Sequence, residues 1–488
     1  MSAAVPTSSP SPAPDRPPTW ARVADLACLA LVALAVVVAE WGGFRERIGS
    51  IRVALTSPYR LLFGAVVLGA LRHYLAPAAP IYRDLPARLA SGWRRPESRT
   101  AWTVLVSTRL SILFVGYMSV VMIGYRPGTP PLRVSENEVG NLQARWDMAW
   151  YFGIATSGYR VLSDNPRDQQ NIVFFPAYPM IVRVAGRLLG GATLAFVVGG
   201  TLVSLGAFFW ALTYLFRIAR DMLGDDDTAR YAVWLIACFF NDTATTEIYT
   251  ESLFLLGVTG AFYHFSRREL VKASLWGLMI GLTRPNGCFL SIPLALMAVS
   301  PWLPDWLRGG RADAGDGARS VPALVRSLAA AAMPGIGVLL YSAYIWSLTG
   351  DPLRWAAGHA AWGREYRGLG VLVTDRYAWL ANEGLYAYSS QVPADLMNAL
   401  GALFVLVAAW PVARRLGLAY AAFILINILP PMAAGGMLSV GRFSSVLFPA
   451  FIWFAAAVPV RQRSGWLAGF MAVQAFGAAL FYTWRDLY

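Results

Sequence analysis

Long apolar stretches dominate this chain and restrict what it can fold into. Of its 488 residues, 57% are hydrophobic and only 14% are charged, which leaves too little polar surface to cover a soluble globule. About thirteen hydrophobic segments follow one another, each judged against the roughly 20 residues needed to cross a bilayer. They lie near 24–43, 58–76, 101–124, 192–216, 228–249, 251–266, 270–286, 287–300, 323–348, 396–412, 416–434, 443–460 and 465–484. The sequence therefore predicts an all-α polytopic membrane protein with about 11–13 transmembrane helices.

The distribution of arginine predicts the orientation of these segments. Arginines concentrate in turns that we expect to be cytoplasmic, because cytoplasmic loops carry an excess of positive charge. These turns lie at 83–99, 267–268, 308–326, 414–415 and 461–463. The same alternation places 125–191, 349–395 and the turn around 435–442 outside a plasma membrane. The net-positive turn near 45–52 fits this scheme poorly.

The segment "FFPAYPMIVRVAGRLLGG" (174–191) contains two prolines and two internal arginines. These residues are unfavourable in a membrane-spanning helix and favour a surface-lying or re-entrant helix within the first external loop.

The segments suggest an order of regions along the chain. Residues 1–19, rich in Pro, Ser and Ala, are expected to be a disordered cytoplasmic tail rather than a signal peptide. After this tail we expect, in order, two transmembrane helices and a cytoplasmic loop in 20–100, a catalytic core in 101–300 with its external loop at 125–191, a cytoplasmic linker in 301–326, and C-terminal transmembrane helices in 327–488 with a second external loop at 349–395.

The formal charge of +13 raises the question of a nucleic-acid partner. The arginines, however, lie mostly in short runs between apolar segments, which is typical of topology signals and contact with anionic lipids. We therefore expect membrane lipids as partners and no nucleic acid. The single lysine, Lys272, and the abundance of Arg and Ala are typical of a GC-rich bacterial genome. The three cysteines have no metal-ligand spacing, and we predict no metal site.

One stretch, "NLQARWDMAWYFGIATSGYR" (141–160), combines a carboxylate with many aromatic side chains. Its notable residues are Arg145, Trp146, Asp147, Trp150, Tyr151 and Tyr159. One interpretation is an interfacial aromatic belt in which Arg145 and Asp147 form a local ion pair. The other is a carboxylate on an apolar floor at the membrane surface, where its pKa can rise toward that of a useful general base.

Five motifs occur in a recognisable order. "RWDMAWYFGIATSGY" is followed by "FFPAYPMIVRVAG", "YTESLF", "GLTRPNG" and "GRFSSVLFP". Together they resemble the PIG-V-like (GPI mannosyltransferase II) glycosyltransferases of the GT-C superfamily, over roughly residues 101–460. The resemblance implies a GT-C-like bundle with short surface helices in its first external loop. It also implies transfer of a sugar, usually mannose, from a polyprenyl-phosphate carrier at the outer face.

The resemblance implies that Asp147 is the catalytic base. Met148 departs from the family pattern, which often has a small residue at this position. The two transmembrane segments before residue 101 are an addition to the shared core.

Transfer chemistry suggests roles for three further residues. An inverting transfer needs a base for the acceptor hydroxyl, and the departing lipid phosphate needs cationic or hydrogen-bonding stabilisation. Arg284 and Arg442 are predicted at external ends of membrane segments, and a guanidinium group suits a phosphate. The alternatives are a structural pair with a neighbouring helix for Arg284 and snorkelling to the headgroups for Arg442. Glu251 begins a segment at the same face, where it is either a substrate contact or a helix-start residue.

The predicted site thus comprises Asp147 as base, with substrate contacts from Arg145, Trp146, Trp150, Tyr151, Glu251, Arg284 and Arg442. His359 and Tyr366 in the second external loop are weaker candidates for acceptor contacts. The external loops lack an Asp-x-Asp pair, so we expect transfer without a metal or any other cofactor, the lipid-phosphate sugar being a co-substrate.

Other functions remain open at this point. The alternatives are a sugar-lipid flippase or transporter, and a non-catalytic membrane assembly protein. Transporters place their key charges near the bilayer midplane and often show two similar halves, whereas here the distinctive residues lie in loops and no internal repeat is evident. The acceptor, a glycolipid or glycan, and the identity of the sugar are not specified by these patterns.

The stretch "NDTATTEIYT" (241–250) does not fit its surroundings. It is polar where the family is apolar, and it matches the in-frame translation of a widely used sequencing adapter. Our hypothesis is that these residues wholly or partly replace native ones. Asp242, Glu247 and the glycosylation triplet at Asn241 therefore receive no role.

Overall fold

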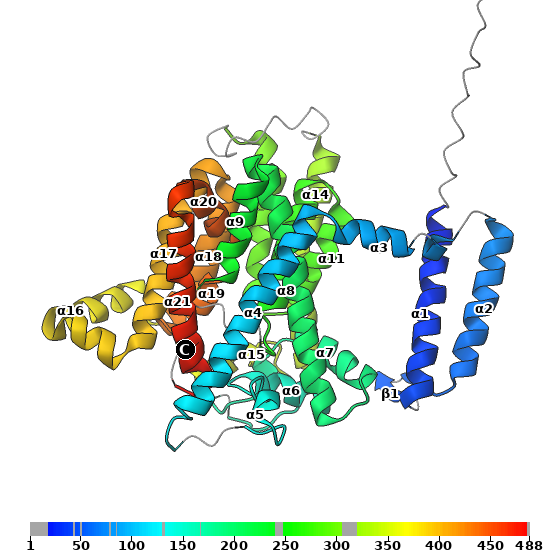
Figure 1. Cartoon of the computed structure of the whole chain (residues 1–488), viewed down its shortest axis with the longest axis horizontal. Coiled ribbons are helices and arrows are strands. Elements are labelled where there is room, and N and C mark those ends of the chain that lie inside the picture. Colours follow the sequence, from blue (N-terminus) through cyan, green and yellow to red (C-terminus); the bar gives the residue numbers. More distant parts are fainter. Residues whose placement is uncertain are drawn as a thin grey trace, which may run out of the picture. The chain divides into compact units, whose positions relative to one another are not determined.

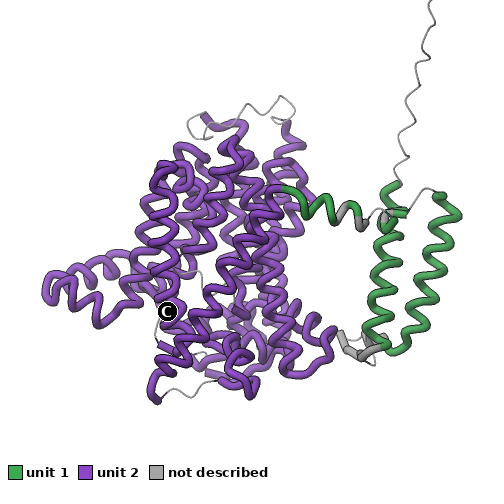
Figure 2. Tube along the Cα trace, in the orientation of Figure 1, with its two compact units in different colours: residues 1–95 green, residues 96–488 purple. Residues whose placement is uncertain are grey.

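The computed structural model describes residues 18–41, 44–48, 51–77, 80–83, 85–128, 132–165, 167–239, 247–304 and 320–485. The predicted N-terminal tail, apart from its last two residues, the Gly-rich part of the linker (309–319) and residues 241–246 lie outside these ranges. The chain divides into two compact units, residues 1–95 and 96–488, as coloured in Figure 2.

The first unit is built from a pair of packed helices. Helix α1 (Thr19–Trp41) packs against α2 (Pro58–Leu75), and a buried ion pair joins them, with 2.7 Å between Arg72 Nε and Asp25 Oδ1. A charge among apolar helices is tolerated when it is paired in this way. The unit also contains η1 (Ile81–Arg83) and α3 (Leu85–Trp93).

A two-stranded antiparallel hairpin connects α1 and α2. It consists of β1 (Phe44–Ile48) and β2 (Ile51–Leu55), paired from Phe44 opposite Leu55 to Ile48 opposite Ile51. This hairpin is the one departure from an all-helical chain within the described residues. It occupies the arginine-containing turn that fitted the predicted orientation poorly.

The second unit is a helical bundle. Its bundle helices are α4 (Pro96–Met122), α8 (Thr193–Leu223), α9 (Asp226–Ala237), α10 (Glu251–Ser266), α11 (Leu270–Gly281), α12 (Ser291–Val299), α14 (Val321–Thr349), α17 (Pro393–Arg415), α18 (Leu418–Gly435), α20 (Phe448–Ala457) and α21 (Arg463–Tyr482). Its shorter or peripheral elements are α5 (Glu138–Asn141), α6 (Met148–Ser157), η2 (Asn171–Val173), α7 (Ala177–Leu188), η4 (Pro285–Leu290), η5 (Ser300–Trp302), α15 (Arg354–Ala357), η7 (Gly358–Trp362), α16 (Leu369–Gln391), α19 (Val440–Ser444) and η8 (Val460–Gln462).

Within the described residues, seven helices are long and apolar enough to cross a membrane by length and composition. This confirms an all-α polytopic membrane protein. The count is below the predicted 11–13 because several apolar segments fold as shorter helices. Helix α9 has 12 residues, α11 has 12 and α20 has 10. A 3₁₀ turn that begins at Pro285 interrupts the apolar sequence between α11 and α12, and proline favours such a break because it lacks a backbone N–H.

Close helix packing builds the centre of the bundle. Helix α10 is buried along almost its whole length and packs against α8 and α11. Helix α11 approaches α14 so closely that a Cβ on Gly281 would lie 2.0 Å from the carbonyl oxygen of Pro334. Small residues allow such backbone contact between membrane helices.

The short helices gather at one end of the bundle. Helices α5, α6, α7 and α15 lie there with the C-terminal end of α21, whereas the N-terminal ends of α4 and α14 lie at the opposite end (Figure 1). The loop 125–191 thus contains short helices, as predicted, and α7 is too short at 12 residues to cross a bilayer. We call this end of the bundle the loop end.

Candidate active site

Asp147 lies at the start of α6, at the loop end. The preceding residue, Trp146, has a φ of 49°, a conformation that is uncommon for a non-glycine residue and is worth inspection near functional sites. The Asp147 N–H donates to the Tyr249 hydroxyl over 2.9 Å. The Asp147 side chain remains 28% exposed, so a substrate can reach its carboxylate.

Asp147 belongs to a chain of ion pairs that brings together the charged residues singled out from the sequence. Arg442 Nη1 lies 3.2 Å from Asp147 Oδ2, and Arg442 Nε lies 3.1 Å from Glu251 Oε1. The same Glu251 oxygen lies 3.1 Å from Arg284 Nη1. Glu251 is 1% exposed, so the charge of this carboxylate is balanced within the protein.

The local sequence explains how two of these residues are presented. Pro285 disfavours a helical conformation of the residue before it, and Arg284 is extended, with φ −152° and ψ 153°. Glu251 is the first residue of α10, where the positive end of the helix dipole favours a carboxylate. The Glu251 oxygens accept no well-aligned hydrogen bond among the described residues, so the ion pairs are their main interactions.

Arg442 is presented by the five-residue helix α19. The residue before this helix, Ser439, has a φ of 61°. The Gly441 N–H donates to the side-chain oxygen of Asn398 on α17 over 2.8 Å. This hydrogen bond ties the helix that carries Arg442 to the bundle.

Arg364 joins this group, although nothing in the sequence singled it out. The guanidinium carbons of Arg364 and Arg284 lie 5.2 and 5.0 Å from the centre of the Phe443 ring. Burial, together with the positive charges of Arg442 and Arg284, lowers the pKa of Arg364 to about 10. We call Asp147, Glu251, Arg284, Arg364 and Arg442 the charged cluster.

Arg145 has a different setting from the one expected. Its fully buried guanidinium donates to the carbonyl oxygens of Asn141, Ala144 and Tyr482 and to the Tyr125 hydroxyl. The local ion pair with Asp147 is absent, because Asp147 pairs with Arg442 instead. We call this group of contacts the Arg145 anchor, since it ties the site loop to the end of α21.

The aromatic residues of the motif line the site loop with different degrees of burial. Trp146 is half-buried, lies 5.0 Å from the Trp484 ring and donates its indole N–H to the Phe481 carbonyl. Trp150 is half-buried and stacks on Phe174 with 5.7 Å between ring centres.

Trp150 also makes an edge contact with Trp362 of the second loop. Tyr151 is buried, and its hydroxyl lies 3.4 Å from the Thr250 hydroxyl. These contacts hold α6 against the bundle.

The weaker candidates of the second loop differ from each other. Tyr366 is 83% exposed, whereas the Nε2 atom of His359 is buried without a hydrogen-bond partner among the described residues. Burial lowers the pKa of His359 to about 4, with a smaller contribution from Arg364, so the imidazole is neutral near pH 7.

No group of three or more His, Cys, Asp or Glu side chains in the described part of the chain is placed to hold a metal ion. Independence from metals and cofactors stays a prediction.

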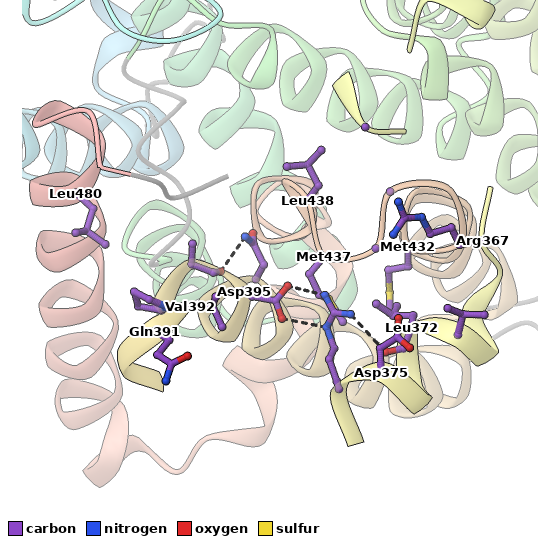
Figure 3. A pocket seen from close by; sticks show the side chains of 18 of the residues that line it. Arg367, Leu372, Asp375, Gln391, Val392, Asp395, Met432, Met437, Leu438 and Leu480 are labelled. Carbon is purple, nitrogen blue, oxygen red and sulfur yellow. Dashed lines mark hydrogen bonds and ion pairs between the residues drawn. The ribbon is translucent and has the colours of Figure 1, made fainter. Parts of the chain in front are cut away.

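A cavity of about 710 Å³ lies beside α16, α17 and α18 (Figure 3). Its polar lining includes Arg367, Asp375, Arg376, Gln391, Asp395 and Asn398. Arg376 and Asp395 are already paired in two places, at 3.0 and 2.5 Å. The cavity borders the charged cluster, because Leu438 lines the cavity and its carbonyl accepts a hydrogen bond from Arg364.

A family model described as mannosyltransferase (PIG-V) matches residues 129–296. This confirms the predicted resemblance over that part of the chain, which contains Asp147, Glu251 and Arg284. Arg364 and Arg442 lie beyond the matched range. No match is found among curated proteins.

Among solved structures, the chain is similar to an archaeal oligosaccharyltransferase, AglB from Archaeoglobus fulgidus, in complex with an inhibitory peptide and a dolichol-phosphate. The identity is 12% and the TM-score 0.37, covering 80% of this chain and 56% of that one. The structure of the Archaeoglobus fulgidus oligosaccharyltransferase with Zn and sulfate matches at 12% identity and a TM-score of 0.36, covering 78% of this chain and 53% of that one. The chain therefore spans about half the length of these proteins.

Proposed function

We propose that this multi-pass membrane protein is a glycosyltransferase that moves a sugar, in the first instance mannose, from a polyprenyl-phosphate carrier to a glycolipid or glycan acceptor. The family match over 129–296 supports the transferase class and mannose. The observation that carries the proposal is the accessible carboxylate of Asp147, a residue inside the matched range, which is oriented by Arg442 from outside that range.

In the proposed reaction, the acceptor hydroxyl attacks the anomeric carbon of the donor sugar while Asp147 takes the hydroxyl proton. A new carbon–oxygen bond forms, and the bond from the anomeric carbon to the phosphate oxygen breaks. The electron pair of that bond leaves with the polyprenyl phosphate, and a single displacement inverts the anomeric configuration. The guanidinium groups beside Asp147 stabilise the negative charge that develops on the phosphate.

The direct test is an incubation of purified protein with polyprenyl-phosphate mannose and a panel of membrane glycolipids. We expect one acceptor to gain the mass of one hexose, and Asp147→Asn to abolish most of that gain. A transporter or an assembly protein would give no product in this assay. Failure of every acceptor in the panel with folded wild-type protein would reject the proposal.

The proposed orientation places the loop end outside the plasma membrane. Single cysteines at the exposed positions Arg160 and Tyr366 should react with an impermeant thiol reagent on intact cells. A cysteine at Arg95, the residue directly before α4, should react only after permeabilisation. The reverse pattern would place the carboxylate on the wrong face for an externally presented lipid donor.

A further inference from the structure

The charged cluster is not electrically balanced. Two carboxylates, Asp147 and Glu251, face three guanidinium groups, which leaves one surplus positive charge. Arg284 and Arg442 are the two cations in contact with those carboxylates. The surplus charge is therefore assigned to Arg364.

The contacts of Arg364 leave most of its donors available. Within the described residues, its guanidinium makes one hydrogen bond, a long one of 3.4 Å from Nη2 to the Leu438 carbonyl, and no ion pair with a carboxylate. The side chain is half-buried and lies against the Phe443 ring. A partly desolvated cation without a carboxylate partner is a favourable partner for an anion, since its field is weakly screened there.

The neighbouring residue His359 does not compensate the charge of Arg364. The neighbouring His359 is neutral near pH 7, so it neither adds to nor cancels the charge. The Arg364 N–H donates to the His359 carbonyl over 3.3 Å, which fixes the backbone of this turn. An anion from outside the chain can therefore supply the missing negative charge.

We propose that Arg364 binds the phosphate of the lipid-linked donor and stabilises it as it departs. This inference rests on the proposed function and adds a residue that the sequence motifs do not contain. The donor phosphate is a diester with one negative charge, and the departing monoester carries about 1.5 to 2 negative charges at pH 7. Because the charge grows as the bond to the sugar breaks, a fixed cation gains more interaction in the transition state than in the ground state.

The planar guanidinium of Arg364 offers two parallel donors to a phosphate, and the ammonium of lysine does not. Arg284 and Arg442, which the sequence suggested for this role, are already paired with Glu251 and Asp147.

The test compares Arg364→Gln and Arg364→Lys with wild-type enzyme, and uses Arg160→Gln as control for the loss of an exposed arginine at the same end. We expect Arg364→Gln to lower kcat/KM for polyprenyl-phosphate mannose by about 10²–10³, the effect of removing one charge-stabilising donor. Arg364→Lys should recover only part of this loss, and the KM for the acceptor should not change. Arg160→Gln should match wild type.

Binding is measured separately from turnover, so that the two proposals fail in distinguishable ways. Undecaprenyl phosphate, the same polyprenol without phosphate, and inorganic phosphate are titrated onto detergent-purified protein, and tryptophan fluorescence is followed. We expect Arg364→Gln to weaken binding of the lipid phosphate at least about tenfold, the change that corresponds to 1.4 kcal/mol. Binding of the polyprenol should be weak and equal in both proteins. Weakened competition by inorganic phosphate in Arg364→Gln would show that the headgroup itself is recognised.

Wild-type affinity for undecaprenyl phosphate in a folded Arg364→Gln variant would overturn the inference even if the enzyme is active. The absence of any sugar transfer by wild-type protein, with phosphate binding that depends on Arg364, would instead reject the transferase and keep the anion site. If Arg364→Gln does not fold, the same measurements on Arg364→Lys decide between these outcomes.

Discussion

Arg145 and Asp147 are separated by one residue, yet their surroundings are opposite in kind. The Arg145 guanidinium donates hydrogen bonds to neutral groups, three carbonyl oxygens and a hydroxyl, and the side chain is fully buried. The charged cluster around Asp147 joins charged groups to one another and keeps 28% of the Asp147 side chain exposed. The Arg145 anchor is thus closed, whereas the charged cluster is partly exposed at Asp147.

The difference between these two surroundings shows two roles that a charged side chain can have in this protein. A buried arginine whose donors are satisfied by carbonyls fixes the backbone, because leaving those carbonyls unpaired would be costly. A carboxylate that shares an arginine with a second carboxylate is oriented but still accessible. Trp146, which lies between Arg145 and Asp147, has a left-handed backbone conformation, and the side chains on either side of it lie in these two different surroundings. The following predictions test whether this division of roles holds.

The largest effect is expected for Asp147→Asn. The amide keeps the shape of the side chain and loses the ability to accept the hydroxyl proton, so turnover should fall by about 10²–10⁴. The measurement is hexose transfer by purified protein, together with donor binding and melting temperature in the same detergent. Binding and melting temperature should stay near wild type, because Asp147 is partly exposed and makes one ion pair.

Retention of more than about a tenth of wild-type turnover in Asp147→Asn would place the base elsewhere, since a positioned base is worth at least about 10². Glu251 would then be the next candidate, as the other carboxylate of the charged cluster.

The next effect is expected for Arg442→Ala. Arg442 contacts both carboxylates of the charged cluster, so its loss disorders Asp147 and removes a cation from the site. We expect a loss of about 2–4 kcal/mol of transition-state stabilisation, by analogy with the removal of one oxyanion donor. Values of kcat/KM for the donor measure this loss.

Arg442→Lys should remain impaired, because one ammonium cannot reproduce separate contacts from Nε and Nη1. Wild-type turnover of Arg442→Ala at normal protein levels would leave Arg442 as a structural partner of the two carboxylates with no part in the reaction.

Sequence patterns identified most members of the charged cluster without showing how they pair. The membrane class follows directly from apolar length, and Asp147, Glu251, Arg284 and Arg442 stand out because charges are rare beside apolar segments. Which arginine contacts which carboxylate depends on the packing of α6, α10 and α19, whose residues are about 100 or more positions apart.

Two members of this region could not be assigned from spacing. Arg364 lies in a loop without periodicity, and its place beside Phe443 arises only when the chain folds. The burial of Arg145 depends on Tyr482 at the far end of the chain, so the adjacent Asp147 was the only visible partner in the sequence.

A smaller effect, and one on stability rather than turnover, is expected for Arg145→Met. Methionine fills part of the same volume but donates no hydrogen bond, so the Tyr482 carbonyl loses its side-chain donor, whereas the Asn141 carbonyl keeps the backbone N–H of Ala144. A buried acceptor left unsatisfied costs about 1–3 kcal/mol, and the melting temperature should fall accordingly. Thermal unfolding in detergent gives the shift.

The control for this change is turnover per folded molecule at a temperature well below the transition. It should stay close to wild type, because the described contacts of Arg145 do not include the charged cluster. A loss comparable to that of Asp147→Asn, with unchanged melting temperature, would show that Arg145 acts in the reaction and that the anchor is not merely structural.

The smallest effect is expected for Trp150→Phe. Phenylalanine keeps an aromatic ring against Phe174 and loses part of the stacked and edge contacts that Trp150 makes with Phe174 and Trp362. Aromatic pairs contribute about 0.5–1.5 kcal/mol beyond their buried area, so turnover should fall by no more than about tenfold.

The interpretation of the motif as an aromatic belt expects the reverse order, in which changes of Trp146 and Trp150 impair the protein more than Asp147→Asn. Measuring product formation and melting temperature for Trp146→Phe, Trp150→Phe and Asp147→Asn in one detergent tests the two orders directly.

Trp146 contacts Trp484 and the Phe481 carbonyl, so its replacement should loosen the same end of α21 that the Arg145 anchor holds. If both tryptophan variants lose more activity than Asp147→Asn, the aromatic side chains seat the loop in the membrane and the carboxylate is not the centre of the chemistry. If Asp147→Asn loses the most, the aromatic contacts support a site whose reaction depends on the carboxylate.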